Sequence, residues 1–284
     1  MKFLVLGASG MAGHTISIYL KEQGHDVLGF VRHEVPFVPC VVGDVMDTNF
    51  VRELIQTGKF DTVINCIGIL NQSAEDHKEH AVFLNSYFPH FLAEVTYGMN
   101  SQVIHMSTDC VFSGKTGQYT EDSLRDGETF YDRTKALGEL SDEKNLTLRN
   151  SIVGPDINAN GIGLLNWFMK QSGEIKGYTH AMWTGMTTLQ LAKIMEKAAI
   201  QRIHGLYNMV PEQNISKYEL LKLFNHYLRY DEIVVNPFDG FSADKTLIRT
   251  KFDFAEIVPD YETMVSEMSE WIRKHAQLYP HYAL

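Results

Sequence analysis

The sequence of 284 residues lacks the features on which several large classes of protein depend. Its three cysteines, Cys40, Cys66 and Cys110, are odd in number and lack metal-type spacing, so they do not indicate a disulfide framework. No apolar run approaches membrane-spanning length, and the twelve histidines are scattered without a metal-binding pattern. With 25 basic against 35 acidic residues, the formal net charge is −10. These absences predict a cytoplasmic protein with no metal site and with neither a membrane nor a nucleic-acid partner.

What the chain does have is enough apolar residues for a sizeable core. The hydrophobic content is 44%, which over this length can fill one domain and a smaller lobe. Apolar strands alternate with helical stretches through the first half of the chain, and this alternation predicts an α/β fold, a Rossmann-type doubly wound parallel sheet with right-handed crossovers. The expected strands are Lys2–Leu6, Asp26–Val31, Cys40–Asp44, Thr62–Gly68, Val103–Ser107 and Leu146–Arg149.

The helical pattern and its loss indicate how the chain divides. Helices are expected from Met11 to Gln23, from about His77 to Met99, and from Tyr261 to His275. After Gly154-Pro155 the alternation weakens. The sequence therefore predicts a dinucleotide-binding domain over residues 1–155, completed by segments from about 178–212, and a mainly substrate-binding lobe over 156–284.

A glycine turn follows the first strand at once. Gly7, Gly10 and Gly13 form a G-x-x-G-x-x-G pattern between an apolar strand and a helix, the context that a dinucleotide fingerprint requires. The first glycine allows the tight turn, the second lets a pyrophosphate approach the backbone, and the third permits close helix–sheet packing. The helix N-terminus then offers free N–H groups to the phosphates. Ser9 and Met11, which lie in this turn, are predicted to contact the cofactor as well.

The ends of the next strands bear on the choice of dinucleotide. An NAD enzyme usually ends its second strand with an acidic residue for the ribose hydroxyl, whereas Arg32 stands at that end here. A guanidinium suits a 2′-phosphate, so NADPH is favoured over NADH, which stays an alternative. Asp44 and Val45 are predicted to face the adenine. The small-residue loop with Cys66 and Gly68 is expected beside the nicotinamide ribose and the phosphates.

Tyr131 and Lys135 carry the predicted acid–base chemistry, and Lys135 is also predicted to bind the nicotinamide ribose hydroxyls of the cofactor. They lie four residues apart and so share one face of a helix. A phenol titrates near pH 10, and a neighbouring ammonium is expected to lower its pKa towards the working range. Thr108, at the end of the fifth strand, is placed to donate its hydroxyl to a substrate oxygen. These three residues are the predicted catalytic set of a carbonyl–alcohol oxidoreductase.

Two strings of sequence carry a family resemblance. Met106-Ser107-Thr108-Asp109-Cys110-Val111-Phe112-Ser113-Gly114 and Tyr131-Asp132-Arg133-Thr134-Lys135-Ala136-Leu137-Gly138-Glu139 resemble the extended short-chain dehydrogenases of the dTDP-4-dehydrorhamnose reductase type. The resemblance extends to Arg149–Pro155 and thins to Gly185–Ala192 beyond. It implies reduction by NAD(P)H of a 4-keto group on a nucleotide-linked deoxysugar, as a step towards polysaccharide precursors. It also implies that Thr108 polarises the keto oxygen, Tyr131 protonates it, and Lys135 tunes the tyrosine.

Several alternatives stay open at this stage. Dehydratases of this fold place Asp-Glu after the threonine, so Asp109-Cys110 disfavours dehydration. Cys110 together with His180 keeps an epimerase or epimerase-reductase open, as in GDP-fucose synthase. A non-catalytic dinucleotide-binding subunit is a further alternative, although such subunits usually lose the tyrosine, lysine or threonine. The predicted substrate-side residues are Asn85, Cys110, His180, Trp183 and Arg249, of which Arg249 is predicted to clamp a diphosphate. A homodimer is considered, and the sequence decides neither the oligomeric state nor the sugar.

Overall fold

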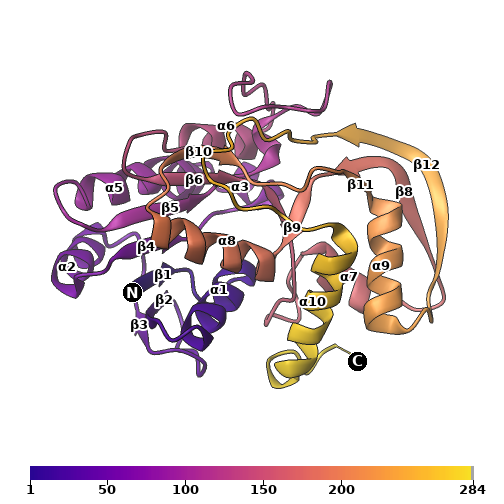
Figure 1. Cartoon of the computed structure of the whole chain (residues 1–284), viewed down its shortest axis with the longest axis horizontal. Helices are drawn as coiled ribbons and strands as arrows, with labels where there is room; N and C mark the ends of the chain where they lie inside the picture. Colours follow the sequence, from indigo (N-terminus) through magenta and orange to yellow (C-terminus); the bar gives the residue numbers. More distant parts are fainter. Residues whose placement is uncertain (283–284) are drawn as a thin grey trace. The chain divides into compact units, whose positions relative to one another are not determined.

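The computed structural model of the protein describes residues 1–282, which form two compact units (Figure 1). The first unit comprises residues 1–113, 124–149 and 192–207. The second comprises residues 114–123, 150–191 and 208–284, of which the last two residues lie outside the described part. The chain therefore leaves the first unit and returns to it twice.

The first unit is built on a seven-stranded sheet in the order β10-β6-β5-β4-β1-β2-β3. Its strands are β1 (Lys2–Leu6), β2 (Asp26–Val31), β3 (Cys40–Val42), β4 (Thr62–Asn65), β5 (Gln102–Met106), β6 (Leu146–Arg149) and β10 (Gly205–Asn208). The pairs from β3 through to β6 are parallel. This order confirms the predicted Rossmann-type sheet, with the strand order reversing beside β1.

Strand register aligns the carboxyl ends of the central strands. Leu6 of β1 pairs with Phe30 of β2 on one side and with Asn65 of β4 on the other. Asn65 in turn pairs with His105 of β5. The residues that follow these strands therefore emerge at one edge of the sheet, where ligands bind in doubly wound folds.

Helices cover both faces of this sheet (Figure 1). On one face lie α1 (Met11–Glu22) and the part of α8 (Thr188–Gln201) that belongs to this unit. Glu196 of α8 connects them, because its carboxylate accepts hydrogen bonds from Tyr19 of α1 and from His25. On the other face lie α2 (Thr48–Gly58) and α5 (Phe88–Val95). The remaining helices of the unit are α3 (Asn71–Asp76), α4 (Lys78–Ala81) and α6 (Phe130–Leu137).

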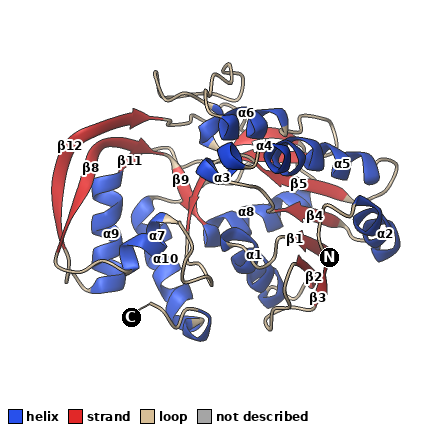
Figure 2. Cartoon of the chain, turned by 180° about the vertical axis from the view of Figure 1, so that it is seen from behind, coloured by secondary structure: helices blue, strands red, loops and turns tan. Residues whose placement is uncertain are grey.

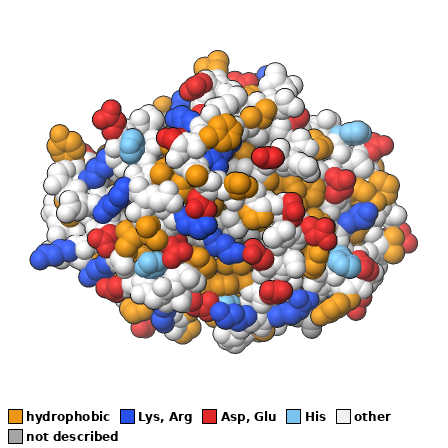
Figure 3. Space-filling model, in the orientation of Figure 1, with side chains coloured by type: hydrophobic (Ala, Val, Ile, Leu, Met, Phe, Trp, Pro, Cys, Tyr) orange, Lys and Arg blue, Asp and Glu red, His pale blue; other side chains and the backbone are white. Residues whose placement is uncertain are grey.

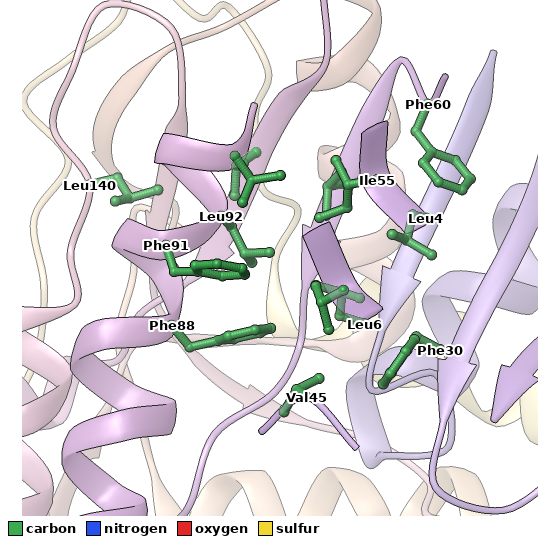
Figure 4. Close-up of a cluster of buried hydrophobic side chains, with 14 residues drawn as sticks. Leu4, Leu6, Phe30, Val45, Ile55, Phe60, Phe88, Phe91, Leu92 and Leu140 are labelled. Carbon is green, nitrogen blue, oxygen red and sulfur yellow. The ribbon is translucent and has the colours of Figure 1, made fainter. Parts of the chain in front are cut away.

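The main core of the unit lies between the sheet and α2 and α5 (Figure 4). Phe88, Phe91 and Leu92 of α5 face the strand residues Leu4 and Leu6. Because parallel strands are covered on both faces, the strand residues alternate little and are almost continuously apolar. Burial of this cluster holds the carboxyl edge of the sheet in place.

The segment predicted as one long helix from His77 to Met99 is divided in the structure. After α4 the chain forms a π-helical turn, Val82–Tyr87, and then α5, which has proline in its first turn and ends at Val95. The expectation of one regular helix was therefore wrong. The physical reason lies in the wider turn around Asn85. The buried side-chain amide of Asn85 forms hydrogen bonds with the backbone of Ile69, which lies outside the helix.

The second unit has smaller sheets. A three-stranded sheet has the order β11-β8-β12, with β8 (Glu174–Trp183), β11 (Ile215–Ser216) and β12 (Val234–Asp244), and Figure 2 shows β8 and β12 side by side. A second, two-stranded sheet pairs β7 (Ser151–Val153) with β9 (Gly185–Thr187). The helices are α7 (Leu164–Met169), α9 (Lys217–Arg229) and α10 (Tyr261–Lys274), the last close to the predicted Tyr261–His275.

Within residues 1–282, no helix is long and apolar enough to cross a membrane. On the face drawn in Figure 3, acidic and basic side chains are interspersed.

Candidate active site

The glycine turn has the geometry of a dinucleotide cradle. Gly7 has a φ of +81°, and its carbonyl accepts a hydrogen bond from the Gly10 amide at 2.9 Å. A Cβ atom added at Gly13 would lie 2.1 Å from the Gly7 oxygen, so only glycine fits there. Gly10 caps α1 without a side-chain hydrogen bond. The first N–H groups of α1 are therefore left for an anionic ligand, and the turn fits the pyrophosphate of a dinucleotide.

The residues after β2 and β3 lie beside this turn in the sheet order. Arg32 directly follows β2 and is exposed, with no ion pair to another residue among residues 1–282. Asp44 follows β3, and its carboxylate accepts the amide of Met46 at 2.9 Å. Val45 is buried in the main core. Arg32 and Asp44 are thus accessible at the predicted edge, while Val45 contributes packing and its contact with adenine stays a prediction.

The loop after β4 carries Cys66 and Gly68. Burial raises the pKa of the Cys66 thiol to about 12, so this thiol is neutral at physiological pH. Asn85 holds Ile69, the residue after Gly68. The side-chain amide of Asn85 accepts a hydrogen bond from the Ile69 backbone nitrogen and donates one to the Ile69 carbonyl oxygen, both at 3.0 Å. It also donates to Thr134 of α6 at 3.2 Å. Asn85 therefore anchors this loop to α6, and its predicted contact with substrate stays a prediction.

Helix α6 places the tyrosine and the lysine. Thr129 and Asp132 form a capping box that starts the helix one residue before Tyr131. Tyr131 and Lys135 then share a face and are both buried. The Thr108 side chain lies beside the Tyr131 hydroxyl, and its own hydroxyl donates to Asp109 Oδ1 at 3.1 Å. Lys135 Nζ donates to the Met106 carbonyl at 2.6 Å. The structure thus brings the three predicted catalytic residues together at the end of β5.

The pKa of Tyr131 differs from the expectation. Burial raises this pKa above its ordinary value, and the neighbouring Thr108 hydroxyl offsets only part of the rise. Burial lowers the pKa of Lys135 to about 8, because a charged ammonium is poorly solvated there. The expected lowering of the tyrosine pKa by lysine is therefore not found. A raised pKa keeps Tyr131 protonated, which is the form needed by a proton donor.

Cys110 lies in the same neighbourhood. It packs with Ile69 and Phe130 against the cluster of Ala74, Ala81 and Tyr131. A charge on its thiol would oppose ionisation of the tyrosine. The backbone amide of Cys110 also donates to the Thr108 hydroxyl at 3.1 Å, so Cys110 belongs to the first unit's site. Its action on substrate stays a prediction.

The sequence reasoning missed an ion-pair network beneath this site. Glu139 lies two residues beyond α6 and binds the buried Arg149 of β6 through two hydrogen bonds, Nε to Oε1 at 2.8 Å and Nη2 to Oε2 at 2.7 Å. Ser107, between Met106 and Thr108, also donates to Glu139 at 2.6 Å. A signal was present, because an arginine in a strand predicted to be buried requires an acidic partner.

The predicted substrate residues of the second unit have different surroundings. His180 is exposed and lies 3.8 Å from Asp239. Trp183 is buried, with Lys217 Nζ 4.5 Å from its ring centroid. Arg249 donates to the carbonyls of Lys251, Phe254 and Glu256, the first at 2.7 Å. This guanidinium ties its own loop together, and its predicted role as a diphosphate clamp stays a prediction.

One group of potential metal ligands is present outside the site. His77, Glu79 and His80 are exposed, and one ligand atom of each lies within 4.8 Å of the others. The sequence-based expectation of no metal site stays a prediction.

The doubly wound sheet, the glycine turn and the tyrosine–lysine pair on α6 define a nucleotide-binding protein of the short-chain dehydrogenase/reductase architecture. A family model described as RmlD substrate binding domain matches residues 1–252. The chain belongs to this family.

Individual relatives agree with this assignment. The chain is 36% identical over 143 residues to a probable low-salt glycan biosynthesis reductase of Haloferax volcanii, covering 49% of this chain and 48% of that protein. It is 31% identical over 141 residues to a dTDP-4-dehydrorhamnose reductase of Mycolicibacterium smegmatis, and this match covers 49% of this chain and 40% of that protein. The matched segments thus span half or less of these relatives.

A solved structure supports the fold. The crystal structure of dTDP-4-dehydrorhamnose reductase from Bacillus anthracis in complex with NADP superposes with a TM-score of 0.79. The two chains are 18% identical, and the match covers 94% of this chain and 98% of that one. At this identity the likeness shows the fold.

Proposed function

We propose that this protein is an NAD(P)H-dependent oxidoreductase of the extended short-chain dehydrogenase type. It reduces a 4-keto group on a nucleotide-linked deoxysugar, in the synthesis of cell-surface polysaccharide precursors. The observation that carries the proposal is the convergence of Thr108, Tyr131 and Lys135 at the sheet edge that also bears the glycine turn. The printed names of the relatives, a glycan biosynthesis reductase and a dTDP-4-dehydrorhamnose reductase, support the substrate class.

Each side chain has a defined task in this reaction. A nicotinamide dinucleotide, when bound at the turn of Gly7 to Gly13, supplies a hydride. Thr108 donates its hydroxyl to the keto oxygen and stabilises the negative charge that develops there. Tyr131 delivers its phenolic proton to this oxygen. Lys135 would hold the ribose hydroxyls of the dinucleotide through its ammonium.

Tyr131 is protonated when the substrate binds, because burial raises the pKa of its phenol. A phenol that is protonated across the physiological range is always ready to donate. The proton leaves only when the substrate oxygen has gained charge, so transfer is coupled to reduction of the carbonyl.

NADPH is the proposed cofactor. Arg32 stands at the end of β2, is exposed and has no ion pair to another residue in the described chain, so its guanidinium is free to pair with a 2′-phosphate. NADH stays the alternative, because the exposed Glu34 close by is a carboxylate that can accept from a ribose hydroxyl.

The test is turnover with defined substrates. Purified protein is mixed with NADPH and UDP-, dTDP- or GDP-linked 4-keto sugars, and NADPH oxidation is followed by absorbance. We expect oxidation with at least one of these and oxidation slower by about 10²–10⁴-fold with Tyr131→Phe. If only small free aldehydes or ketones react and no nucleotide competes, the nucleotide-sugar assignment is wrong. Binding of NADPH without any turnover favours the non-catalytic subunit.

An epimerase-reductase is the second candidate, favoured by the packing of Cys110 against the cluster that contains Tyr131. Such an enzyme exchanges a proton at the carbon next to the ketone. Reaction in deuterated water distinguishes the two candidates. We expect no deuterium at that carbon, and deuterium that is lost in Cys110→Ala would establish the epimerase-reductase instead.

A nucleotide-sugar substrate is the proposed small-molecule partner. A cytoplasmic location and a homodimer stay predictions.

A further inference from the structure

A buried carboxylate lies directly behind the proposed site. The side chain of Glu139 is 1% exposed. It accepts hydrogen bonds from Ser107 at 2.6 Å and from two nitrogens of Arg149 at 2.7 and 2.8 Å. Arg125 Nε donates to the same carboxylate. Donors from three separate parts of the first unit therefore meet on one side chain.

The Arg149 side chain has no exposed surface, and its guanidinium lies 5.0 Å from the ring centroid of Phe112. Burial of two charges carries a large desolvation cost, and a well-packed apolar pair in such a place is often as stable or more stable. The pair is therefore poorly explained by stability alone. Its position relative to the catalytic residues offers a better explanation.

Three consecutive residues at the end of β5 connect this pair to the site. The Met106 carbonyl accepts a hydrogen bond from Lys135, the Ser107 hydroxyl donates to Glu139, and the Thr108 side chain lies beside the Tyr131 hydroxyl. Glu139 thus holds the end of β5 through Ser107, the middle one of these three residues. A shift there would move the carbonyl that binds the lysine and the hydroxyl that binds the tyrosine together.

We infer that Glu139, held by Arg149, is a positioning residue for the acid–base site: it fixes the end of β5 that carries Thr108 and places a negative charge behind Lys135. The kinetic part of this inference rests on the proposed reductase function. The structural and electrostatic part does not, because it concerns groups within the first unit alone.

The charges around Lys135 give the inference a direction. Lys135 interacts with Glu139 beyond its own helix, with Cys66 of the loop after β4 and with His105 of β5. Cys66 is neutral, with its pKa raised to about 12, and burial lowers the pKa of His105 well below its ordinary range, so His105 is neutral too. Glu139 raises the pKa of Lys135, which burial has lowered to about 8.

The sign of each substitution follows from this arrangement. Glu139→Gln keeps an acceptor for Ser107 but removes the negative charge and leaves Arg149 uncompensated. The pKa of Lys135 then falls further, and its ammonium is lost at a lower pH. Arg125→Met removes a cation from the same carboxylate and leaves the buried pair intact, so the pKa of Lys135 rises. A merely structural role predicts no such opposition.

The experiment measures Lys135 directly, without turnover. Protein labelled with ¹³Cε-lysine is titrated by NMR, and the Lys135 signal is assigned by its absence in Lys135→Arg. We expect the midpoint to fall by about one pH unit in Glu139→Gln and to rise by less in Arg125→Met. Glu143→Gln, which removes an exposed carboxylate in the same part of the chain, should leave it unchanged.

Kinetics on the same variants supply the second readout. Misplacement of catalytic groups by about 1 Å can cost up to about 10²-fold in rate, so kcat of Glu139→Gln should fall about tenfold or more. The Kd for NADPH should stay within about twofold, and the alkaline limb of the kcat profile should move to lower pH.

The outcomes separate the two hypotheses. Unchanged midpoints in both variants, or shifts in the same direction, overturn the inference. If Glu139→Gln does not fold, Arg125→Met alone decides, and the absence of an upward shift overturns it. Opposite shifts in a protein that turns over no keto sugar support the placement of Glu139 and contradict the proposed function.

Discussion

The two units of the molecule differ in how well a residue's place in the sequence predicts its place in space. In the first unit, Gly7, Arg32, Cys66 and Thr108 each follow a parallel strand, and the register of those strands brings them to one edge. In the second unit, His180 is exposed, Trp183 is buried and Arg249 binds its own loop. In a regular parallel sheet, the strand register determines where the residues after each strand lie. Short sheets joined by long loops do not determine residue positions in this way. The following experiments test this difference.

The largest effect is expected in the first unit, at Tyr131. Tyr131→Phe removes the phenolic proton and keeps the ring that packs against Ala74 and Ala81. General acid catalysis is typically worth about 10²–10⁴-fold, so kcat should fall by that factor. Steady-state kinetics with a keto-sugar nucleotide measure it. Unchanged NADPH binding is the control, and near-normal turnover would show that another group donates the proton.

The glycine turn gives the next largest effect and contains its own control. A Cβ at Gly13 would meet the Gly7 oxygen at 2.1 Å, whereas a Cβ at Gly10 would lie 3.4 Å from it. Gly13→Ala forces the turn apart, and such overpacking costs about 1–3 kcal/mol. It should therefore lower both the melting temperature and the NADPH affinity.

Gly10→Ala has room within the protein and should lower only the affinity, because the added methyl group meets the pyrophosphate. Thermal melts and fluorescence titration of NADPH separate the two variants. Equal melting temperatures for Gly13→Ala and the unmodified protein would contradict the close contact between helix and turn.

These cases show which parts of the fold and site can be predicted from sequence. The strand Lys2–Leu6 and the glycine pattern fix the cradle locally, and the spacing of Tyr131 and Lys135 fixes their shared helix face. The π-helical turn around Asn85 could not be predicted, because it depends on a hydrogen bond to Ile69, sixteen residues earlier. Local pattern determines local structure, whereas tertiary hydrogen bonds alter it.

The pKa of Tyr131 was also predicted wrongly from the sequence, because it depends on tertiary contacts and burial. Spacing places Lys135 on the same face, but its ammonium donates to the Met106 carbonyl, and burial dominates the tyrosine. The Glu139–Arg149 pair was also missed. Its members are ten residues apart and meet only because α6 and β6 return to the end of β5.

In the second unit, Arg249 offers a test with a smaller effect. Arg249→Met leaves the carbonyls of Lys251, Phe254 and Glu256 without these donors, and an unsatisfied buried group costs about 1–3 kcal/mol. These groups are part-buried, so we expect the lower end of that range in urea unfolding. Lys170→Met, an exposed change in the same unit, is the control. A loss of nucleotide affinity at unchanged stability would instead establish the diphosphate clamp.

The smallest effect is expected at Arg32, where the first unit's edge meets solvent. NADPH should bind more tightly than NADH, because the guanidinium pairs with the 2′-phosphate. Arg32→Ala should reduce the difference between the two affinities. Exposed ion pairs are weak and screened by salt, so the change should be up to about fivefold and should shrink at high ionic strength. Fluorescence titrations of both dinucleotides measure it, with His33→Ala as the matched neighbour. Equal affinities in the unmodified protein would contradict the NADPH assignment. A preference for NADH that is abolished by Glu34→Gln would transfer the selection to that carboxylate, two residues further along the same loop.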